Sequence, residues 1–264
     1  MAHCPLLGPR VSDSVTTMIF AWNRWLGKRF FVTAALALLP LLCSCATVET
    51  ESNVQNAQAH YKIGVGYLSE NKVQQAFVEF QKAYELHPGN KEVLNAIGII
   101  YLLHFDETQK AVDYFQKALK IDPDYSEANN NLGYAQEKLG NFEASIPYYR
   151  KAVSNLVYTT PEKAFINMGR AYYRMGKYEN ALTAYKEAIK RAPNLDLPYL
   201  GLALCYNATG KYGDASASLT RAIGLNPLYK GDARLAAEDF NSRRIITSGY
   251  EQKDLSDYLE ILKY

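Results

Sequence analysis

The side chains that could carry out catalysis or bind a metal ion are few and scattered in this sequence. After position 45 they are His60, His87, His104 and Cys205. A catalytic histidine needs a positioned partner, and Cys205 lies between apolar residues, where a cysteine acts as a small core side chain. The sequence contains no HExxH, GxSxG or P-loop motif. It therefore predicts no catalytic residue, no metal site and no cofactor, and we do not expect an enzyme.

The overall charge argues against a nucleic-acid partner. The chain has 264 residues, with 29 Lys and Arg against 27 Asp and Glu, and no Lys/Arg-rich run. Binding to a phosphate backbone needs many clustered cations, which are absent from this sequence. With 48% hydrophobic residues the composition is too apolar for a wholly disordered chain.

The segment before Cys45 differs from the rest of the chain. Three basic residues between positions 24 and 29 precede residues 30–42, which carry no charge. A helix of this length would reach about 20 Å, less than the roughly 30 Å core of a bilayer. Basic, apolar and small residues in this order are typical of a signal peptide.

The residues Leu42-Cys43-Ser44-Cys45 resemble the lipobox of bacterial lipoproteins. The resemblance implies a lipoprotein signal peptide at 1–44 and lipidation, such as palmitate, on Cys45. Several acyl chains would give a stable anchor. Because Ala46 stands where an aspartate would retain the protein in the inner membrane, the resemblance implies the periplasmic face of the outer membrane. Lipidation of Cys43 is a weaker alternative because bulky Leu42 would precede it. An ordinary signal peptide or a buried core helix also remains open.

The position of the start codon and of the cleavage site determines the length and the charge of the mature chain. A start at Met18 would give a signal peptide of more usual length and make residues 1–17 an artefact of start-site choice. Removal of residues 1–44 takes away four basic residues and one acidic residue, which leaves a net charge of about −1. Residues 45–56 are predicted to be the lipidated cysteine and a flexible tether, since they carry no helical stripe of apolar residues.

From residue 57 the chain repeats itself. Small residues recur at Gly64, Gly98, Gly133, Gly169 and Ala203. A second series consists of Ala83, Ala118, Ala152, Ala188 and Ala222. Prolines follow at Pro88, Pro123, Pro193 and Pro227, whereas the third unit runs on to Pro161. A period near 34 residues is typical of a helical solenoid.

These units resemble the tetratricopeptide repeat. The fourth unit fills the pattern with Phe165, Met168, Gly169, Tyr172, Gly176, Ala181, Tyr185, Ala188 and Pro193. The resemblance implies an all-α fold, a right-handed superhelix (α-solenoid). Its five clear repeats would lie at 57–90, 91–125, 126–161, 162–195 and 196–229. Residues 230–264 would supply a degenerate sixth repeat or a C-terminal cap, with a last helix from about Lys253 to Leu262 and an apolar face of Leu255, Leu259 and Leu262.

The small residues have physical reasons to recur. Gly or Ala on the first helix of a pair, and Ala on the second, allow two helices to approach closely. Gly140, Gly176 and Gly210 are expected just past the ends of first helices, where a left-handed conformation costs glycine little. Proline ends second helices because it cannot continue a helix.

The family resemblance places a partner-binding groove on the first helices of the repeats. The predicted groove residues are Tyr61, Val65, Leu68, Asn95, Ile99, Leu102, Asn130, Tyr134, Ile166, Arg170, Tyr173, Leu200 and Leu204. Both ends of this set are apolar and its middle is polar, which favours an apolar helix or a hydrophobic strand as the guest. Burial of Leu197, Leu200 and Leu204 by the C-terminal cap is an equally open alternative.

Anchor, tether, repeats and short tail together resemble the type IV pilus biogenesis lipoproteins, the pilotins that help an outer-membrane secretin to localise and assemble. The resemblance implies a non-enzymatic scaffold whose partners are secretin subunits, attached to the membrane through lipid, with no nucleic acid and no small-molecule substrate. Two other functions stay open: an assembly lipoprotein of the outer-membrane barrel-insertion machinery, and an adaptor for periplasmic peptidoglycan enzymes.

Overall fold

The computed structural model describes residues 50–264, of which 51–264 form one compact unit. The described part is all-helical. Its helices are α2 (Glu51–Ser69), α3 (Val73–Leu86), α4 (Lys91–Leu103), α5 (Thr108–Ile121), α6 (Ser126–Lys138), α7 (Phe142–Ser154), α8 (Pro161–Arg174), α9 (Tyr178–Arg191), α10 (Leu197–Ala208), α11 (Tyr212–Leu225), α12 (Ala233–Ile246) and α13 (Gly249–Ile261). The predicted signal peptide and Cys45 lie outside the described residues.

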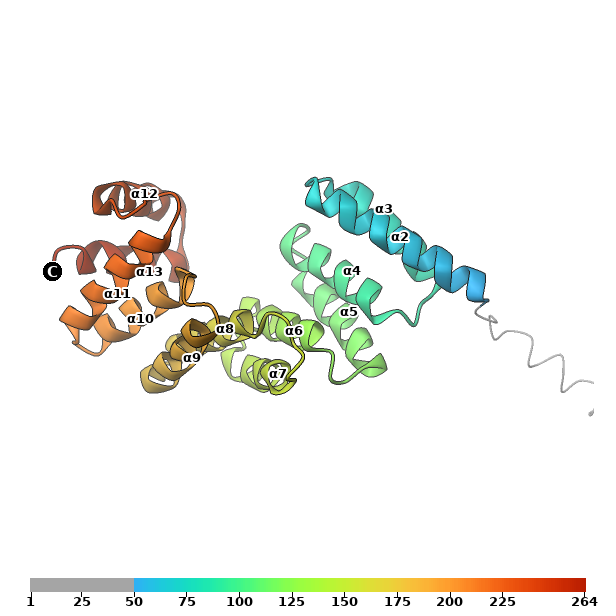
Figure 1. Ribbon diagram of the computed structural model, residues 1–264, viewed down its shortest axis with the longest axis horizontal. Coiled ribbons are helices and arrows are strands. Elements are labelled where there is room, and N and C mark those ends of the chain that lie inside the picture. Colours follow the sequence, from blue (N-terminus) through green and yellow to red (C-terminus); the bar gives the residue numbers. More distant parts are fainter. Residues whose placement is uncertain (1–49) are drawn as a thin grey trace, which may run out of the picture. The chain divides into compact units, whose positions relative to one another are not determined.

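Consecutive helices pack in pairs, and each pair packs on the next. The first five pairs are α2/α3, α4/α5, α6/α7, α8/α9 and α10/α11. The first helices α4, α6, α8 and α10 also contact one another in order, and so form the inner face of the stack. Figure 1 shows the pairs following one another from α2 to α11. This arrangement confirms the predicted α-solenoid.

The small residues found in the sequence lie where the two helices of a pair touch. Ala83, Ala118, Ala152 and Ala188 are fully buried. At Gly98 the helices come so close that a Cβ atom would lie 2.5 Å from the ring of Phe115 on α5. The spacing of small residues therefore follows from close packing, with an aromatic ring of the second helix filling the space over the glycine.

The turns inside the pairs also follow the sequence. Gly140, Gly176 and Gly210 have φ values of +80°, +70° and +73°, and each lies two residues after its first helix. Pro88 and Pro123 each lie two residues after the end of a second helix. Residue type therefore fixes where these helices end.

Three predicted boundaries are wrong. The tether was expected to reach residue 56, but α2 already begins at Glu51, because residues 51–56 continue the helix that buries Ala57, with a carboxylate in its first turn. Pro161 does not close the third repeat; it begins α8, a position that tolerates proline since no amide hydrogen bond is needed there. The last helix begins at Gly249 rather than at Lys253.

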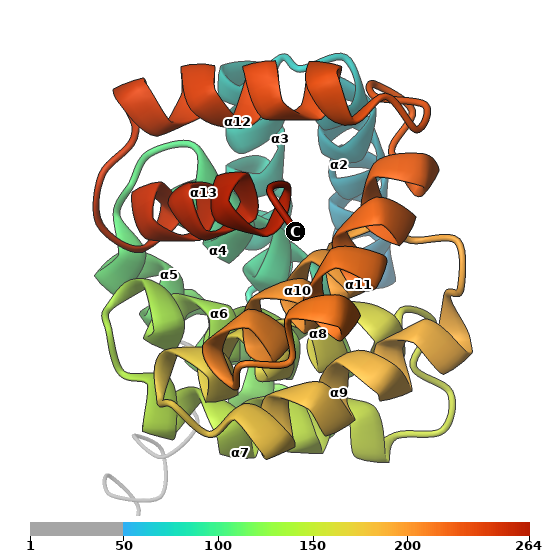
Figure 2. The ribbon, with the colours of Figure 1, turned by 90° about the vertical axis from the view of Figure 1, so that its left-hand side faces the viewer.

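The last two helices form a complete pair that docks differently from the others. α13 packs on α10 and α11, and α12 contacts α13 more extensively than α11. Figure 2 shows α12 and α13 at one end of the stack, with α13 beside α10. The buried face of α13 consists of Leu255, Tyr258 and Ile261 rather than Leu255, Leu259 and Leu262. The C-terminal residues therefore form a cap that turns back over the inner face.

Candidate functional site

The inner face of the solenoid has an exposed apolar region at one end, a region covered by α13 at the other end, and a polar network between them. We call the part formed by Tyr61, Val65 and Leu68 on α2 and Ile99 on α4 the open half. Val65 is 45% exposed, and the other three side chains are half-buried. Tyr61 lies against Phe80 of α3, with ring centroids 5.7 Å apart. The open half therefore presents aromatic and aliphatic surface that no later helix of the described chain covers.

Hydrogen-bonded amides occupy the middle of the inner face. Nδ2 of Asn131 on α6 donates to Oδ1 of Asn95 on α4 over 2.9 Å. One repeat further on, Nδ2 of Asn167 on α8 donates to Oδ1 of Asn130 over 3.1 Å. An asparagine amide has two donor hydrogens and an acceptor oxygen with two lone pairs, so these side chains can hold one another and still bind a guest. Amides thus link three consecutive first helices.

An ion pair continues this polar network towards the C-terminus. Nε of Arg170 donates to Oε1 of Glu137 over 2.8 Å, and Nη2 donates to Oε2 over 3.1 Å. The hydroxyl of Tyr149 donates to Glu137 over 2.6 Å. Burial, then the charge of Glu137, raises the pKa of Tyr149, so this hydroxyl remains a donor at neutral pH. Burial alone would lower the pKa of Arg170, but the charge and hydrogen bonds of Glu137 raise it above its usual value.

The remaining part, which we call the covered half, lies under α13. Arg174 of α8 makes a two-pronged ion pair with Asp254 of α13, including a 2.7 Å bond from Nη1 to Oδ1. Its guanidinium also lies 4.7 Å from the ring centroid of Tyr250. Both partners of the ion pair are largely buried, a geometry in which removal of one charge is costly. α13 is therefore fixed to the inner face by charge as well as by apolar packing.

A cavity of about 770 Å³ lies between the covered half and the C-terminal pair. Aromatic side chains in its lining come from several elements: Tyr134, Phe142, Tyr229, Phe240, Tyr250 and Tyr258. The lining contains four cations, Lys138, Arg170, Arg174 and Arg243, and each is paired with a carboxylate. A cavity walled by aromatic rings and compensated charges offers no general acid, base or nucleophile with an evident catalytic partner.

The structure divides the predicted groove residues into accessible and buried sets. Tyr61, Val65, Leu68, Ile99, Tyr134, Arg170 and Leu200 keep part of their surface exposed. By contrast, Asn95, Leu102, Asn130, Ile166, Tyr173 and Leu204 are each at most 9% exposed. The prediction that this second set lines an open groove is wrong, because neighbouring first helices bury four of them and α13 covers Tyr173 and Leu204. The alternative in which the cap buries the last repeat holds for Leu204 and partly for Leu200, whereas Leu197 is exposed.

Sequence reasoning missed Asn131 and Asn167. The three amides Asn95, Asn131 and Asn167 lie 36 residues apart on successive first helices. This repeated spacing is a signal that could have found them, but it runs one residue out of register with the predicted groove positions at 130 and 166.

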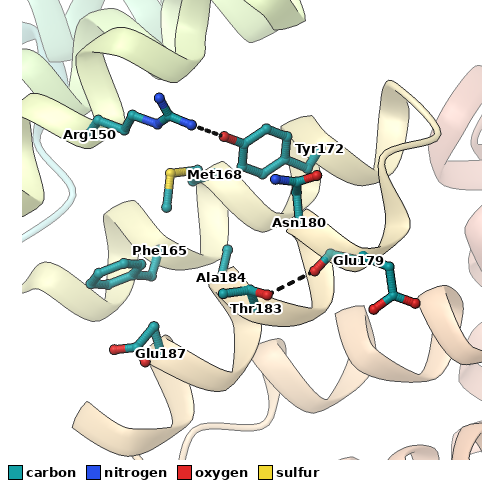
Figure 3. A pocket seen from close by; sticks show the side chains of 9 residues that line it. All are labelled: Arg150, Phe165, Met168, Tyr172, Glu179, Asn180, Thr183, Ala184 and Glu187. Carbon is teal, nitrogen blue, oxygen red and sulfur yellow. Dashed lines mark hydrogen bonds between the residues drawn. The ribbon is translucent and has the colours of Figure 1, made fainter.

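A second concave region lies outside the inner face. Residues of α8 and α9, together with Arg150 of α7, line a pocket of about 320 Å³. Figure 3 shows Phe165, Met168 and Ala184 in this pocket, where Nη2 of Arg150 donates to the hydroxyl of Tyr172 over 2.8 Å. The pocket contains no predicted groove residue, and its volume lies at the lower end of the range found for small-molecule pockets.

Two of the titratable residues singled out by the sequence, Cys205 and His60, have structural roles. Cys205 is fully buried, and burial, followed by the charge of Glu179, raises the pKa of its thiol to about 12, so the reactive thiolate is not formed at neutral pH. Nδ1 of His60 lies 2.6 Å from Oε2 of Glu79, which joins α2 to α3. The described residues hold no group of His, Cys, Asp and Glu side chains that could bind a metal ion. Among residues 50–264, none of the helices combines the length and hydrophobicity needed to cross a bilayer.

Comparison with known families identifies the repeats. Tetratricopeptide-repeat families match residues 162–195, residues 107–140, and residues 126–155 and 198–227. The first match coincides with the fourth predicted repeat. Together with the paired helices, these matches show that the chain folds as a tetratricopeptide-repeat α-solenoid.

Individual proteins give similar results. The type IV pilus assembly protein PilF of Pseudomonas aeruginosa is 26% identical over 147 residues, which are 52% of this chain and 58% of PilF. The crystal structure of PilW, a type IV pilus biogenesis factor, superposes with a TM-score of 0.60 at 22% identity and covers 75% of this chain and 96% of PilW. YrrB, a repeat protein with an unusual peptide-binding site, gives a TM-score of 0.53 at 21% identity and covers 72% of this chain and 95% of YrrB. The chain spans less than two thirds of the length of the curated relatives it matches.

Proposed function

We propose that this chain is a non-enzymatic scaffold that holds a protein partner against the open half of its inner face. The observation that carries the proposal is the row Tyr61, Val65, Leu68 and Ile99, which remains partly exposed although the corresponding residues Tyr173 and Leu204 are buried. Apolar surface gains about 25 cal/mol for each Å² removed from water. A partner that covers this row therefore gains the stabilisation that α13 already provides in the covered half.

The neighbouring polar network determines what kind of partner fits. Asn131 on α6 and Asn167 on α8 continue the inner face beyond the apolar row. Their oxygens already accept hydrogen bonds from Asn130 and Arg170, but each amide nitrogen has a second donor hydrogen for a guest. A peptide segment has apolar side chains for the open half and backbone amides for the asparagines. A helix would use the apolar row alone, and an extended strand would use both.

A more specific function is a pilotin role in type IV pilus biogenesis. Its support is the similarity to PilF and PilW, together with the lipobox-like residues before Cys45. In this proposal, lipid on Cys45 attaches the scaffold to the periplasmic face of the outer membrane, and the inner face holds secretin subunits. Attachment of both to one membrane raises the effective concentration of the subunits during assembly. The rival functions, in barrel insertion or in control of peptidoglycan enzymes, use the same open half with another protein.

The groove can be tested with one double variant. Val65→Asp with Ile99→Asp places charges in the open half, and we expect at least about a tenfold loss of secretin binding, since each buried charge would need a partner. Binding would be measured by titrating purified secretin subunits against the immobilised protein. Val78→Asp is the matched control, because Val78 is 51% exposed on the second helix α3 and should leave binding unchanged. Equal losses in both variants would count against the groove.

The anchor needs a separate test. Cys45→Ala should abolish incorporation of labelled palmitate and leave an uncleaved precursor, because lipidation and cleavage both require a cysteine as the first mature residue. Metabolic labelling followed by electrophoresis measures this directly. Cys43→Ala is the control and should be labelled normally; labelling of the Cys45 variant at the wild-type level would rule out the assignment.

A further inference from the structure

The turns that join one repeat to the next have a common structure. In the fifth repeat, Oδ1 of Asn226 accepts a hydrogen bond from the amide of Leu228 over 2.9 Å, and the carbonyl of Asn226 accepts from the amide of Tyr229 over 3.2 Å. The third repeat has the same two bonds from Asn155, to the amides of Val157 and Tyr158, over 3.1 and 3.2 Å. In both turns the tyrosine is buried and anchors the turn.

The tips of these turns differ between repeats. We call the third residue after the end of each second helix the tip of the turn. At the tip the first, second and fourth repeats carry Gly89, Asp124 and Asn194, which suit a solvent-exposed turn. The third and fifth repeats carry Val157 and Leu228, which are 80% and 74% exposed. Leu156, which is 98% exposed, replaces the proline of the other turns. Two rigid turns therefore hold three apolar side chains out into solvent.

The tips lie along one edge of the solenoid. Figure 2 shows the turns α7–α8, α9–α10 and α11–α12 one above the other on the right-hand side. Between the two apolar tips the chain places Lys190 and Arg191, the last residues of α9, which share the carboxylate of Glu187. The apolar tips therefore flank a turn that carries two cations, both paired with Glu187.

Charge separates these three turns from the first two. We compare the stretch from the last turn of each second helix to the first turn of the next helix. In each of the third, fourth and fifth stretches two cations stand against one carboxylate. The third has Lys151 and Lys163 with Glu162, the fourth has Lys190 and Arg191 with Asp196, and the fifth has Lys230 and Arg234 with Asp232. In the first two stretches carboxylates outnumber cations. The first has Glu85 and Glu92 with Lys91, and the second has Asp122, Asp124 and Glu127 with Lys120. Among residues 50–264, Lys151 pairs with Asp124 and Arg234 with Asp232, whereas Lys163 and Lys230 take part in no ion pair.

From this pattern we infer that the edge formed by the turns α7–α8, α9–α10 and α11–α12 binds the surface of a bilayer that contains anionic lipid. Apolar side chains on projecting turns can enter the boundary between headgroups and acyl chains, and nearby cations are attracted to anionic headgroups. A protein pocket would have to accommodate two separate projections with cations between them, whereas a flat bilayer accepts all of them at once. This surface is separate from the open half and leaves it free for a protein partner.

Vesicle flotation tests the inference. The probe is residues 50–264, which contain all the packed cores described above and leave out the apolar residues 30–42 that would bind vesicles by themselves. We expect this fragment to float with vesicles of three parts phosphatidylethanolamine to one part phosphatidylglycerol at low salt. It should stay unbound with pure phosphatidylcholine vesicles and dissociate at high salt, since the attraction is screened.

Variants assign the binding to the edge. Leu156→Asn, Val157→Asn and Leu228→Asn combined should lower vesicle affinity by about tenfold or more, because each loses its apolar contact with the acyl region. Lys163→Gln with Lys230→Gln should lower the affinity and its salt dependence. The matched control is Ile245→Asn with Ile246→Asn, which are 72% and 82% exposed at the end of α12 and should bind as the wild type does.

Three results would overturn the inference. They are no flotation of the wild-type fragment, undiminished flotation of the triple asparagine variant, and an equal loss in the α12 control. Circular dichroism of each variant checks the fold, which these exposed positions should not affect. If the tips bind a protein and not a bilayer, the wild-type fragment will not float with the vesicles.

Discussion

Close packing at single glycines sets the geometry of each repeat. At Gly64, Gly98, Gly133 and Gly169, an added Cβ would lie 2.5 to 2.7 Å from a Phe or Tyr ring of the paired helix. Real side chains do not approach so closely, so the ring and the helix must shift. The sequence allowed these positions to be predicted, because glycine at a fixed period inside a helical pattern has no other common explanation.

Gly98→Ala should therefore destabilise the protein by about 1–3 kcal/mol, the usual cost of overpacking a core, although alanine favours a helix. The matched control is Gly66→Ala on α2, where nothing lies within 4 Å of the added Cβ. There the helix preference acts alone, and we expect a gain of about 0.5–1 kcal/mol. Urea unfolding of both variants measures the two changes, and a gain at both positions would show that Phe115 moves aside without cost.

The C-terminal helix illustrates what the sequence did not reveal. A final amphipathic helix was expected, but its buried face is shifted from Leu259 and Leu262 to Tyr258 and Ile261. The spacing of apolar residues identifies a helix, yet two adjacent faces of α13 fit that spacing equally well. In the structure α13 docks with Asp254 paired to Arg174, which lies 80 residues away in the chain. Such a contact has no local signal.

Leu255→Ala should loosen α13 without unfolding the repeats. Leu255 is 2% exposed, so its truncation should cost about 2–5 kcal/mol at the site. Because α13 is the last helix, the loss should appear as local opening, with faster amide hydrogen exchange in α13 than in α4. Leu235→Ala on α12, where the side chain is 45% exposed, is the control and should change exchange little. Faster exchange throughout residues 51–264 would mean that the cap is not a separate unit of stability.

On the scale of the whole molecule, the inner face is shared between the chain itself and a partner. The apolar residues at its C-terminal end, predicted to bind a guest, are largely covered by α13, and those at its N-terminal end are not. The repeat pattern gave the positions on the inner face but could not give their exposure, since exposure depends on where α13 docks. One apolar half is covered by α13 and the other is exposed, and this contrast is the basis of the proposed scaffold function.

The most direct test of that function is site-specific photo-crosslinking in cells that produce the full chain. A photoreactive amino acid at Val65 should crosslink to one discrete protein, identified by mass spectrometry, and the proposal predicts a secretin subunit. The same amino acid at Val78, which is similarly exposed on α3, should give no such product. A crosslink from Val65 to another discrete protein would support the groove as the binding site and show that the partner is not a secretin. If Val65 gives no crosslinked product, or if Val78 gives the same product, the proposed binding of a protein partner to the open half is contradicted.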